Sequence, residues 1–233
     1  MSKSISGVGV LDKAIVILDA LAVSSCTLNE LMAATGLPRA TAYRLATALE
    51  AHRLVARDAA GQFCLGGKLA ELARGGSGVS DLAPLAVERL RDLTGESAQV
   101  YVRQGDQRVC VAAAERPTGL RDSVPVGAVL PLTAGSAAQV LLAWAAAADR
   151  DRLLAHAAFT DRALASVRRR GWAESVGERE SGVASVSAPV VVGEQLVAAI
   201  SVSGPIDRLG RTPGRRFAAA VQSAAHSLAA ALT

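Results

Sequence analysis

The sequence has few of the residues that mark extracellular or metal-binding proteins. Its 233 residues include only three cysteines, Cys26, Cys64 and Cys110, which are too few and too scattered for a disulfide framework. Neither a Cys-x-x-Cys pair nor a Cys/His spacing typical of zinc ligands occurs. We therefore expect no structural disulfide, no metal site and no cofactor.

Long apolar stretches are also missing. Although 51% of the residues are hydrophobic, alanine supplies much of that fraction, and no uninterrupted apolar run approaches the roughly 20 residues that a transmembrane helix needs. The first residues, MSKSISGVGVLDK, lack the apolar segment and cleavage site of a secretory signal. These absences predict a soluble, cytoplasmic protein.

The motifs of common enzymes are absent as well. There is no G-x-S-x-G nucleophile elbow and no G-x-x-x-x-G-K-[ST] phosphate loop, and the three histidines, His52, His156 and His226, lie on separate predicted helices. We predict that the protein is not an enzyme, and we assign no catalytic residue. Aromatic residues make up only 3% of the chain, which disfavours a non-specific nucleic-acid chaperone, because such proteins stack bases on aromatic rings.

The length of the chain and one glycine-rich segment predict two domains. The segment Gly75-Gly76-Ser77-Gly78 is typical of a flexible linker. We place the boundary there, between residues 1–76 and residues 77–233. The net charge of +4 and the pI near 9.3 suit a polyanionic partner but do not by themselves decide the function.

The N-terminal region has the spacing of a helix-turn-helix. Apolar residues repeat with helical period over residues 10–22. Thr27 and Glu30 form a capping box that predicts the start of a second helix, which should end near Gly36. A third helix is predicted to begin near Pro38. Two helices joined by so short a turn are typical of motifs that place the second helix in the DNA major groove.

The third predicted helix has one apolar and one polar face. Its core stripe is Ala42, Leu45, Ala46 and Leu49, and its outward stripe is Ala40, Tyr43, Arg44 and Thr47. Residues 54–57 and 62–65 flank a turn and predict a β-hairpin, which would be the wing. The set predicted to contact DNA comprises Thr27, Arg39, Ala40, Thr41, Tyr43, Arg44, Thr47, Arg57 and Gln62.

The C-terminal region mixes helices and strands, so the fold class predicted for the chain is α+β. Helices are expected at residues 81–93, 135–148, 149–156 and 160–170, and from Thr212-Pro213 onward. Strands are expected at residues 99–103, 108–113, 183–192 and 196–203.

These motifs resemble the IclR family of bacterial transcriptional regulators. The resemblance lies in TLNELMAATGLPRATAYRLATALEAHRLV with the G-x-F-x-L-G end of the wing, and in PLTAGSAAQVLLAW, RRRGWAESVGERESGVASVSAPV and AAISVSGP. Within the family, SGVGVLDKA, LTGESAQVY, AAAERPTGLRDSVPVG and GERESGVASVSAPV resemble the NdgR type of actinobacterial regulators of amino-acid biosynthesis, notably of leucine genes. The resemblance implies a GAF-like effector-binding and oligomerisation domain, a homodimer or tetramer, and binding to inverted repeats near promoters.

The resemblance also implies the residues that bind the effector. Carried over motif by motif, they are Ser136, Ala137, Ser175, Ser185, Ser201 and Ser203. The alternation of Ser201 and Ser203 puts both hydroxyls on one face of a strand, where they either bind a ligand carboxylate or find partners within the protein. Family members that bind small oxoacids have Asp and Cys where this chain has Ser175 and Ser185, so its ligand is expected to differ.

The sequence therefore predicts a DNA-binding transcriptional regulator with a small-molecule effector, such as a carboxylate or an amino-acid-related metabolite. At Tyr43 many relatives have histidine, so the operator sequence is not carried over. The alternative is a small-molecule-binding enzyme or storage protein whose N-terminal helices mediate dimerisation, against which the missing catalytic motifs count.

Overall fold

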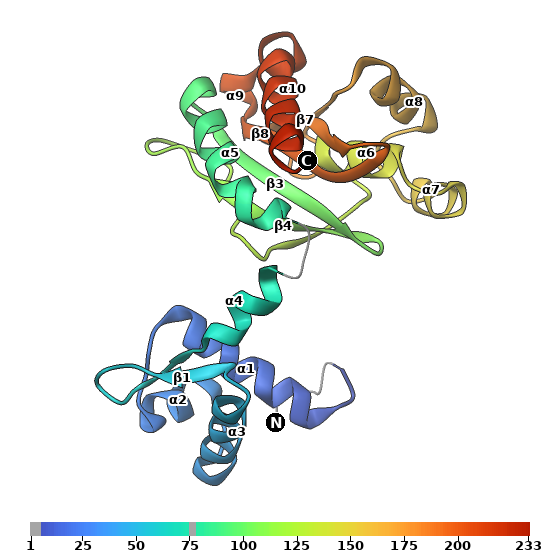
Figure 1. Ribbon diagram of the computed structural model, residues 1–233. Helices are drawn as coiled ribbons and strands as arrows, with labels where there is room; N and C mark the ends of the chain where they lie inside the picture. The colour runs from blue at the N-terminus through green and yellow to red at the C-terminus, as the bar shows by residue number, and fades with distance from the viewer. Residues whose placement is uncertain (1–5, 75–77) are drawn as a thin grey trace. The chain divides into compact units, whose positions relative to one another are not determined.

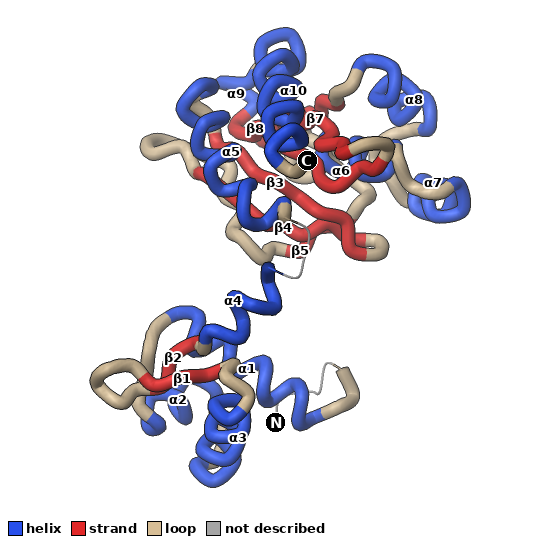
Figure 2. The backbone as a smooth tube through the Cα atoms, viewed as in Figure 1, coloured by secondary structure: helices blue, strands red, loops and turns tan. Residues whose placement is uncertain are grey.

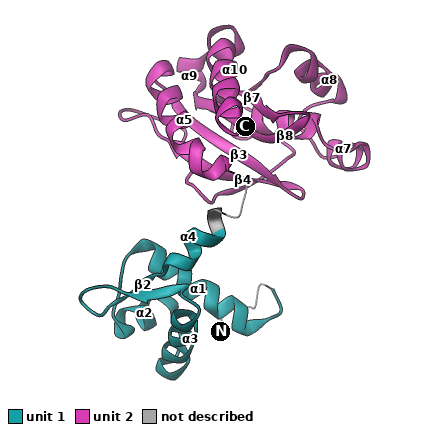
Figure 3. Ribbon diagram, in the orientation of Figure 1, with its two compact units in different colours: residues 1–76 teal, residues 77–233 magenta. Residues whose placement is uncertain are grey.

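The computed structural model describes residues 6–74 and 78–233, which divide into two compact units, residues 1–76 and residues 77–233 (Figure 3). Each unit has a hydrophobic core of its own. Most of the predicted linker, residues 75–77, lies outside the described residues. Within the described ranges, no helix combines the length and the apolar character needed to cross a membrane.

Unit 1 opens with three helices whose apolar faces meet in one core. They are α1 (Gly9–Val23), α2 (Leu28–Thr35) and α3 (Arg39–Ala51). The predicted capping box is present at α2, where the backbone N–H of Thr27 donates to Glu30 Oε2 at 2.8 Å and the backbone N–H of Glu30 donates to Thr27 Oγ1 at 3.4 Å. Gly36 ends α2 with a left-handed φ of 68°. The predicted helix-turn-helix is confirmed.

The predicted hairpin follows α3 (Figure 2). Strands β1 (Val55–Arg57) and β2 (Phe63–Leu65) pair antiparallel, and α4 (Gly67–Arg74) follows them. Asp58 Oδ1 accepts hydrogen bonds from the N–H groups of Ala60 and Gln62, both at 2.9 Å, which closes the turn. The buried Phe63 also joins the core of the three helices. The hairpin is therefore anchored to the helices at its base.

Unit 2 is built on one six-stranded antiparallel sheet. In the order in which they pair, the strands are β5 (Val129–Pro131), β4 (Gln107–Ala114), β3 (Ser97–Gln104), β8 (Gln195–Pro205), β7 (Val183–Val192) and β6 (Ala173–Val176). The long central strands β8 and β7 are largely buried, because helices cover both faces of the sheet.

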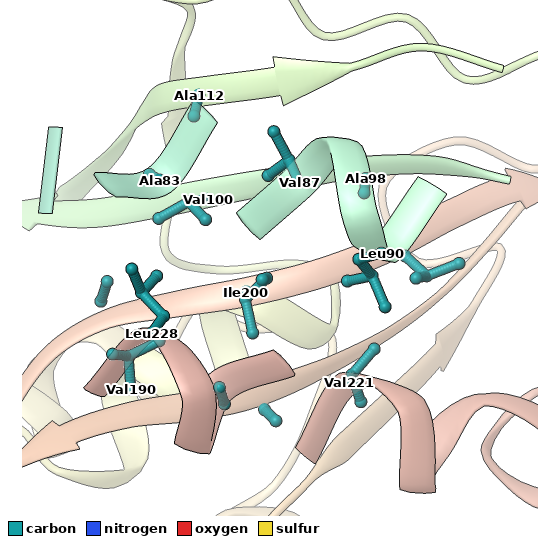
Figure 4. Close-up of a cluster of buried hydrophobic side chains, with 14 of the residues drawn as sticks. Ala83, Val87, Leu90, Ala98, Val100, Ala112, Val190, Ile200, Val221 and Leu228 are labelled. Carbon is teal, nitrogen blue, oxygen red and sulfur yellow. The ribbon is translucent and has the colours of Figure 1, made fainter. Parts of the chain in front are cut away.

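The two faces of this sheet differ in chemistry. Helices α5 (Val79–Thr94) and α10 (Gly214–Ala231) cover the apolar face, where alternate residues such as Val100 and Ile200 pack (Figures 1 and 4). Helix α6 (Ser136–Ala143), with α8 (Asp161–Arg170) against it, covers the other face. On that face the same alternation leaves buried polar side chains, among them Gln99 and Ser201.

Two further helices complete unit 2, α7 (Ala147–Leu154) and α9 (Ile206–Leu209). The fold class predicted from the sequence, an N-terminal winged helix-turn-helix followed by a C-terminal α/β domain, is confirmed. The long helices and the central strands lie within a few residues of their predicted bounds.

The single helix predicted for residues 135–148 is wrong. Helix α6 ends at Ala143, and α7 begins separately at Ala147. The alanine-rich segment between them has high helix propensity, so its sequence does not signal an end. In the structure, Nη1 of Arg168 on α8 donates to the carbonyl of Ala143 at 2.7 Å. This contact from a distant residue satisfies a carbonyl at the end of α6 that would otherwise lack a partner.

Candidate DNA-binding surface and effector cavity

The predicted outward stripe of α3 is exposed to solvent. Ala40, Tyr43, Arg44 and Thr47 are all exposed. On the opposite face of the helix, Ala42, Ala46 and Leu49 are buried. Tyr43 presents 52% of its surface although it is a large aromatic residue. Among the described residues, the Arg44 guanidinium has neither a hydrogen bond nor an ion pair. This face therefore presents a free cation and a free phenol, both of which can bind base edges or phosphates.

Other residues of the predicted DNA-binding set have partners within the protein. The Arg39 guanidinium donates to Asn29 Oδ1 at 2.9 Å, and the Arg57 guanidinium pairs with Glu50 at 3.1 Å and lies over the Phe63 ring at 4.1 Å. Thr41 and Gln62 are half-buried.

Thr27 also has a role inside the protein, because its hydroxyl belongs to the capping box of α2. Part of the predicted set thus holds the motif together. Arg44, Tyr43 and Thr47 remain exposed and available to contact DNA.

All six predicted effector-binding residues line one cavity of unit 2. Ser136 and Ala137 begin α6, Ser175 lies on β6, and the remaining three serines lie on neighbouring strands. The register places Ser185 of β7 opposite both Ser175 and Ser203. Sheet pairing therefore brings together residues that are up to 67 positions apart, from Ser136 to Ser203.

Four serine hydroxyls, those of Ser185, Ser136, Ser187 and Ser201, form a continuous hydrogen-bonded chain. Ser136 Oγ lies 2.7 Å from both Ser185 Oγ and Ser187 Oγ, and Ser187 Oγ lies 2.6 Å from Ser201 Oγ. Ser203 Oγ donates to Gln99 Oε1 at 3.0 Å. These hydroxyls therefore have protein partners, but each oxygen can accept a second hydrogen bond. A ligand in the cavity would extend this network.

Five further polar residues line the cavity and were not predicted from the sequence: Gln99, Tyr101, Arg108, Asp122 and Arg179. Gln99 and Arg108 occupy strands that are otherwise mainly apolar or small, and both are buried. A long polar side chain inside such a strand is the signal that could have identified them, because burying it requires a partner or a function. Asp122 and Arg179 lie in loops, where charged residues carry no such signal.

The charged groups of the cavity are held in different ways. Arg179 Nη2 contacts both oxygens of Asp122, at 2.6 and 2.7 Å, and Asp122 is buried. Arg108 Nη1 donates to the carbonyls of Pro131 and Ala134. Burial lowers the pKa of Arg108 to about 10, so the guanidinium remains charged at neutral pH. Burial also raises the pKa of Tyr101, which stays a neutral phenol.

The cavity is small, with a volume of about 20 Å³. That space suits about one water molecule, so binding of a metabolite requires side chains to move. Elsewhere in the described residues, no group of three His, Cys, Asp or Glu side chains is arranged to hold a metal ion.

Comparison with known proteins connects these two sites to a family. Residues 10–59 match the IclR helix-turn-helix domain, and residues 76–230 match the family described as bacterial transcriptional regulator IclR C-terminal. The HTH-type transcriptional regulator BhcR of Paracoccus denitrificans is 31% identical over 243 residues, covering 95% of this chain and 86% of its own length. The glycerol operon regulatory protein of Streptomyces griseus is 30% identical and covers 78% of each chain.

Solved structures show the same fold. The IclR protein of Thermotoga maritima superposes with a TM-score of 0.72 at 20% identity, covering 96% of this chain and 98% of its own. An IclR homologue of Microbacterium hydrocarbonoxydans, crystallised with 4-hydroxybenzoate, superposes with a TM-score of 0.74 at 22% identity and the same coverage. Together, the matches over both units show that this chain belongs to the IclR family of bacterial transcriptional regulators.

Proposed function

We propose that the protein binds inverted repeats near its target promoters through α3 and the hairpin of β1 and β2, and that a small molecule in the cavity of unit 2 changes its affinity for DNA. The observation that carries the DNA-binding part is the exposed face of α3, where Arg44 and Tyr43 are available for contacts. In a helix-turn-helix, this is the helix that enters the major groove.

The regulator acts as a homodimer or tetramer in this proposal. A dimer would set its two α3 helices in successive major grooves about one helical turn apart, with the two hairpins on the flanking backbone. The effector must bind one arrangement of the helices more tightly than the other, because a ligand with equal affinity for both shifts nothing. A preference of about 100-fold would supply roughly 2.7 kcal/mol.

A carboxylate or an amino-acid-related metabolite is the effector that we infer for the cavity. Its hydroxyls and arginines can bind a carboxylate, and 4-hydroxybenzoate, the compound crystallised with the Microbacterium homologue, is a carboxylate. The resemblance to the NdgR type leads us to propose genes of amino-acid biosynthesis, in particular leucine genes, as the targets. Ser136, Ala137, Ser175, Ser185, Ser201 and Ser203 would contact the effector.

A mobility-shift assay at controlled salt tests this function. The purified full-length protein is titrated onto DNA from its own promoter region and from the leucine biosynthesis promoters, with random DNA as competitor. Selective binding that resists the competitor, and that changes when a metabolite is added, is the expected result. If no genomic DNA, including fragments recovered in a genome-wide selection, binds better than random DNA, the proposal is wrong.

A further inference from the structure

Arg108 is a buried cation that lacks an ion pair. Only 3% of the residue is exposed. Among the described residues, no carboxylate oxygen lies within 4.0 Å of its guanidinium. The guanidinium lies over the Tyr101 ring, 5.4 Å from its centroid, which offsets only part of the cost of burial. The positive charge of Arg179 adds to that of Arg108, and Glu178 acts on it only at longer range. A charge buried in this way is costly unless something balances it.

Other arginines of unit 2 have carboxylate partners that balance their charge. Arg103 lies directly opposite Arg108 in the register of β3 and β4, and it pairs with Asp149 at 2.7 Å. Arg150 also has an Nε without a hydrogen bond, but this atom lies 3.5 Å from a carboxylate oxygen of Asp161. Arg108 alone of these three has no carboxylate within that range in the described part of the chain.

The hydrogen bonds of Arg108 are also incomplete. Its Nη1 donates to the carbonyls of Pro131 and Ala134, which fixes the guanidinium in place. Its Nε is buried and has no partner among the described residues. Buried charged donors are rarely left in this state. The guanidinium is therefore fixed in position, while its Nε–H donor has no acceptor in the described part of the protein.

Arg108 lies beside the first turn of α6, within the cavity lining. A Cβ atom placed on Gly135, the N-cap of α6, would lie 3.4 Å from Arg108 Nη2. The first N–H groups of a helix carry partial positive charge and bind anions. Here the N–H of Gly135 already donates to Glu178 Oε2 at 2.9 Å, a carboxylate that does not line the cavity. The charged lining residues are Arg108, Arg179 and Asp122, of which the last two pair with each other. One full positive charge thus remains in the lining, next to the helix terminus.

We propose that Arg108 is the counter-ion for a carboxylate of the effector, so that the cavity selects small monoanionic carboxylic acids over uncharged molecules of the same shape. This inference rests on the proposed function of the cavity and names the chemical class of its ligand. The carboxylate would balance the charge of Arg108 and accept from its free Nε. The hydroxyls of Ser201 and Ser203 would then meet the rest of the ligand.

Pairs of acids and their amides test the charge preference, because each pair differs in charge but hardly in shape. Propionate and propionamide, and 3-methylbutanoate and its amide, are titrated into the full-length protein by calorimetry at pH 7. The acids are expected to bind and the amides are not. In Arg108→Gln, affinity for the acids should fall at least about 30-fold, the loss typical when one partner of a buried charge pair is removed.

Two further variants serve as controls. Arg103→Gln removes the same charge from the position opposite Arg108, where a carboxylate partner exists, and should leave acid binding unchanged. Arg108→Lys keeps the charge, so it should retain the preference for acid over amide even if its affinity is lower. If Arg108→Gln does not fold, as judged by its thermal unfolding, the lysine variant decides, and equal binding of acid and amide by it would contradict the proposal.

Three results would overturn the inference: equal binding of acids and amides by the unaltered protein, unchanged acid binding by Arg108→Gln, or no binding of either acid at millimolar concentration. Binding of operator DNA without ligand is measured for every variant. If DNA binding is intact and an uncharged molecule proves to be the effector, the regulator function stands and the role of Arg108 fails. If neither the unaltered protein nor any of the variants binds DNA selectively, the proposed function itself fails.

Discussion

Arg44 is the residue whose replacement tests the DNA-binding face most directly. We expect Arg44→Ala to weaken operator binding by about 1–3 kcal/mol, because a side chain that reads a base contributes that much. Folding should be unchanged, since the guanidinium has no partner among the described residues. Arg211→Ala, which removes an exposed arginine from unit 2, is the matched control for net charge. Equal operator affinity of the Arg44 variant and the unaltered protein would refute the role.

The capping box at α2 predicts a pH dependence of stability. Hydrogen bonds from Thr27 lower the pKa of Glu30 below its usual value of 4.5. Because the folded-state pKa is depressed, the stabilisation is present above the unfolded-state pKa and is lost as the pH falls through the folded-state value. The stability difference between the unaltered protein and Glu30→Gln should therefore shrink between pH 6 and pH 3. Urea unfolding at several pH values measures it, and a constant difference would contradict the prediction.

The same box predicts the effect of losing the threonine hydroxyl. Thr27→Ala should lower the free energy of unfolding of unit 1 by about 1 kcal/mol at neutral pH, as for other N-cap threonines. Thr27→Ser, which retains the hydroxyl, should be close to unaltered in the same urea titration. If the serine variant loses as much stability as the alanine variant, the capping hydrogen bond is not the cause.

Some residues of the cavity could be predicted from the sequence and others could not. The six positions carried over from the family resemblance do meet in one cavity. Arg108 was not predicted. Its long charged side chain within β4 is a local signal, but its burial depends on β5 and on the segment before α6, which the sequence pattern did not place beside it. The sequence thus predicted the hydroxyls of the cavity but not its charge.

At the scale of elements, two adjacent glycines at the end of the hairpin offer a matched pair. A Cβ on Gly66 would lie 2.1 Å from the carbonyl oxygen of Arg53, whereas a Cβ on Gly67 would meet nothing within 4 Å. We expect Gly66→Ala to destabilise unit 1 by more than about 2 kcal/mol, because backbone has to move. Gly67→Ala, at the start of α4, should be neutral or stabilise by up to about 1 kcal/mol.

Thermal unfolding and operator binding measure the effect of both glycine variants. Loss of DNA binding in Gly66→Ala, with normal binding in Gly67→Ala, is the expected pattern. Similar stability of the two variants would show that the close approach of Gly66 to Arg53 does not constrain the hairpin.

Helices and strands could be predicted where residues near their ends determine where they begin and end. The capping box and Gly36 bound α2, and both signals are local. The short strands β5 and β6 and the helix α9 were not predicted, because they have three or four residues each and depend on pairing or packing with distant segments. Helix α6 ends where Arg168 of α8 reaches its last carbonyl, a contact that no local pattern encodes.

At the scale of the whole molecule, the separate cores of the two units predict that they unfold separately. A ligand at 100 times its dissociation constant stabilises the part that binds it by about 2.7 kcal/mol. Operator DNA should therefore raise the unfolding midpoint of unit 1 by roughly 10 °C or more, and an effector should mainly raise that of unit 2. Differential scanning calorimetry measures both. A single transition that both ligands shift equally would show that the units unfold together.

The division into two units also has a practical consequence for spectroscopy. Both tryptophans of the chain, Trp144 and Trp172, belong to unit 2. The Arg170 guanidinium lies over the Trp172 ring, 3.7 Å from its centroid, and the ring also lies close to Gly214 at the start of α10. Intrinsic tryptophan fluorescence therefore reports on the effector-binding half of the molecule alone, and an operator that quenches or shifts it would make the communication between the two halves visible without any label.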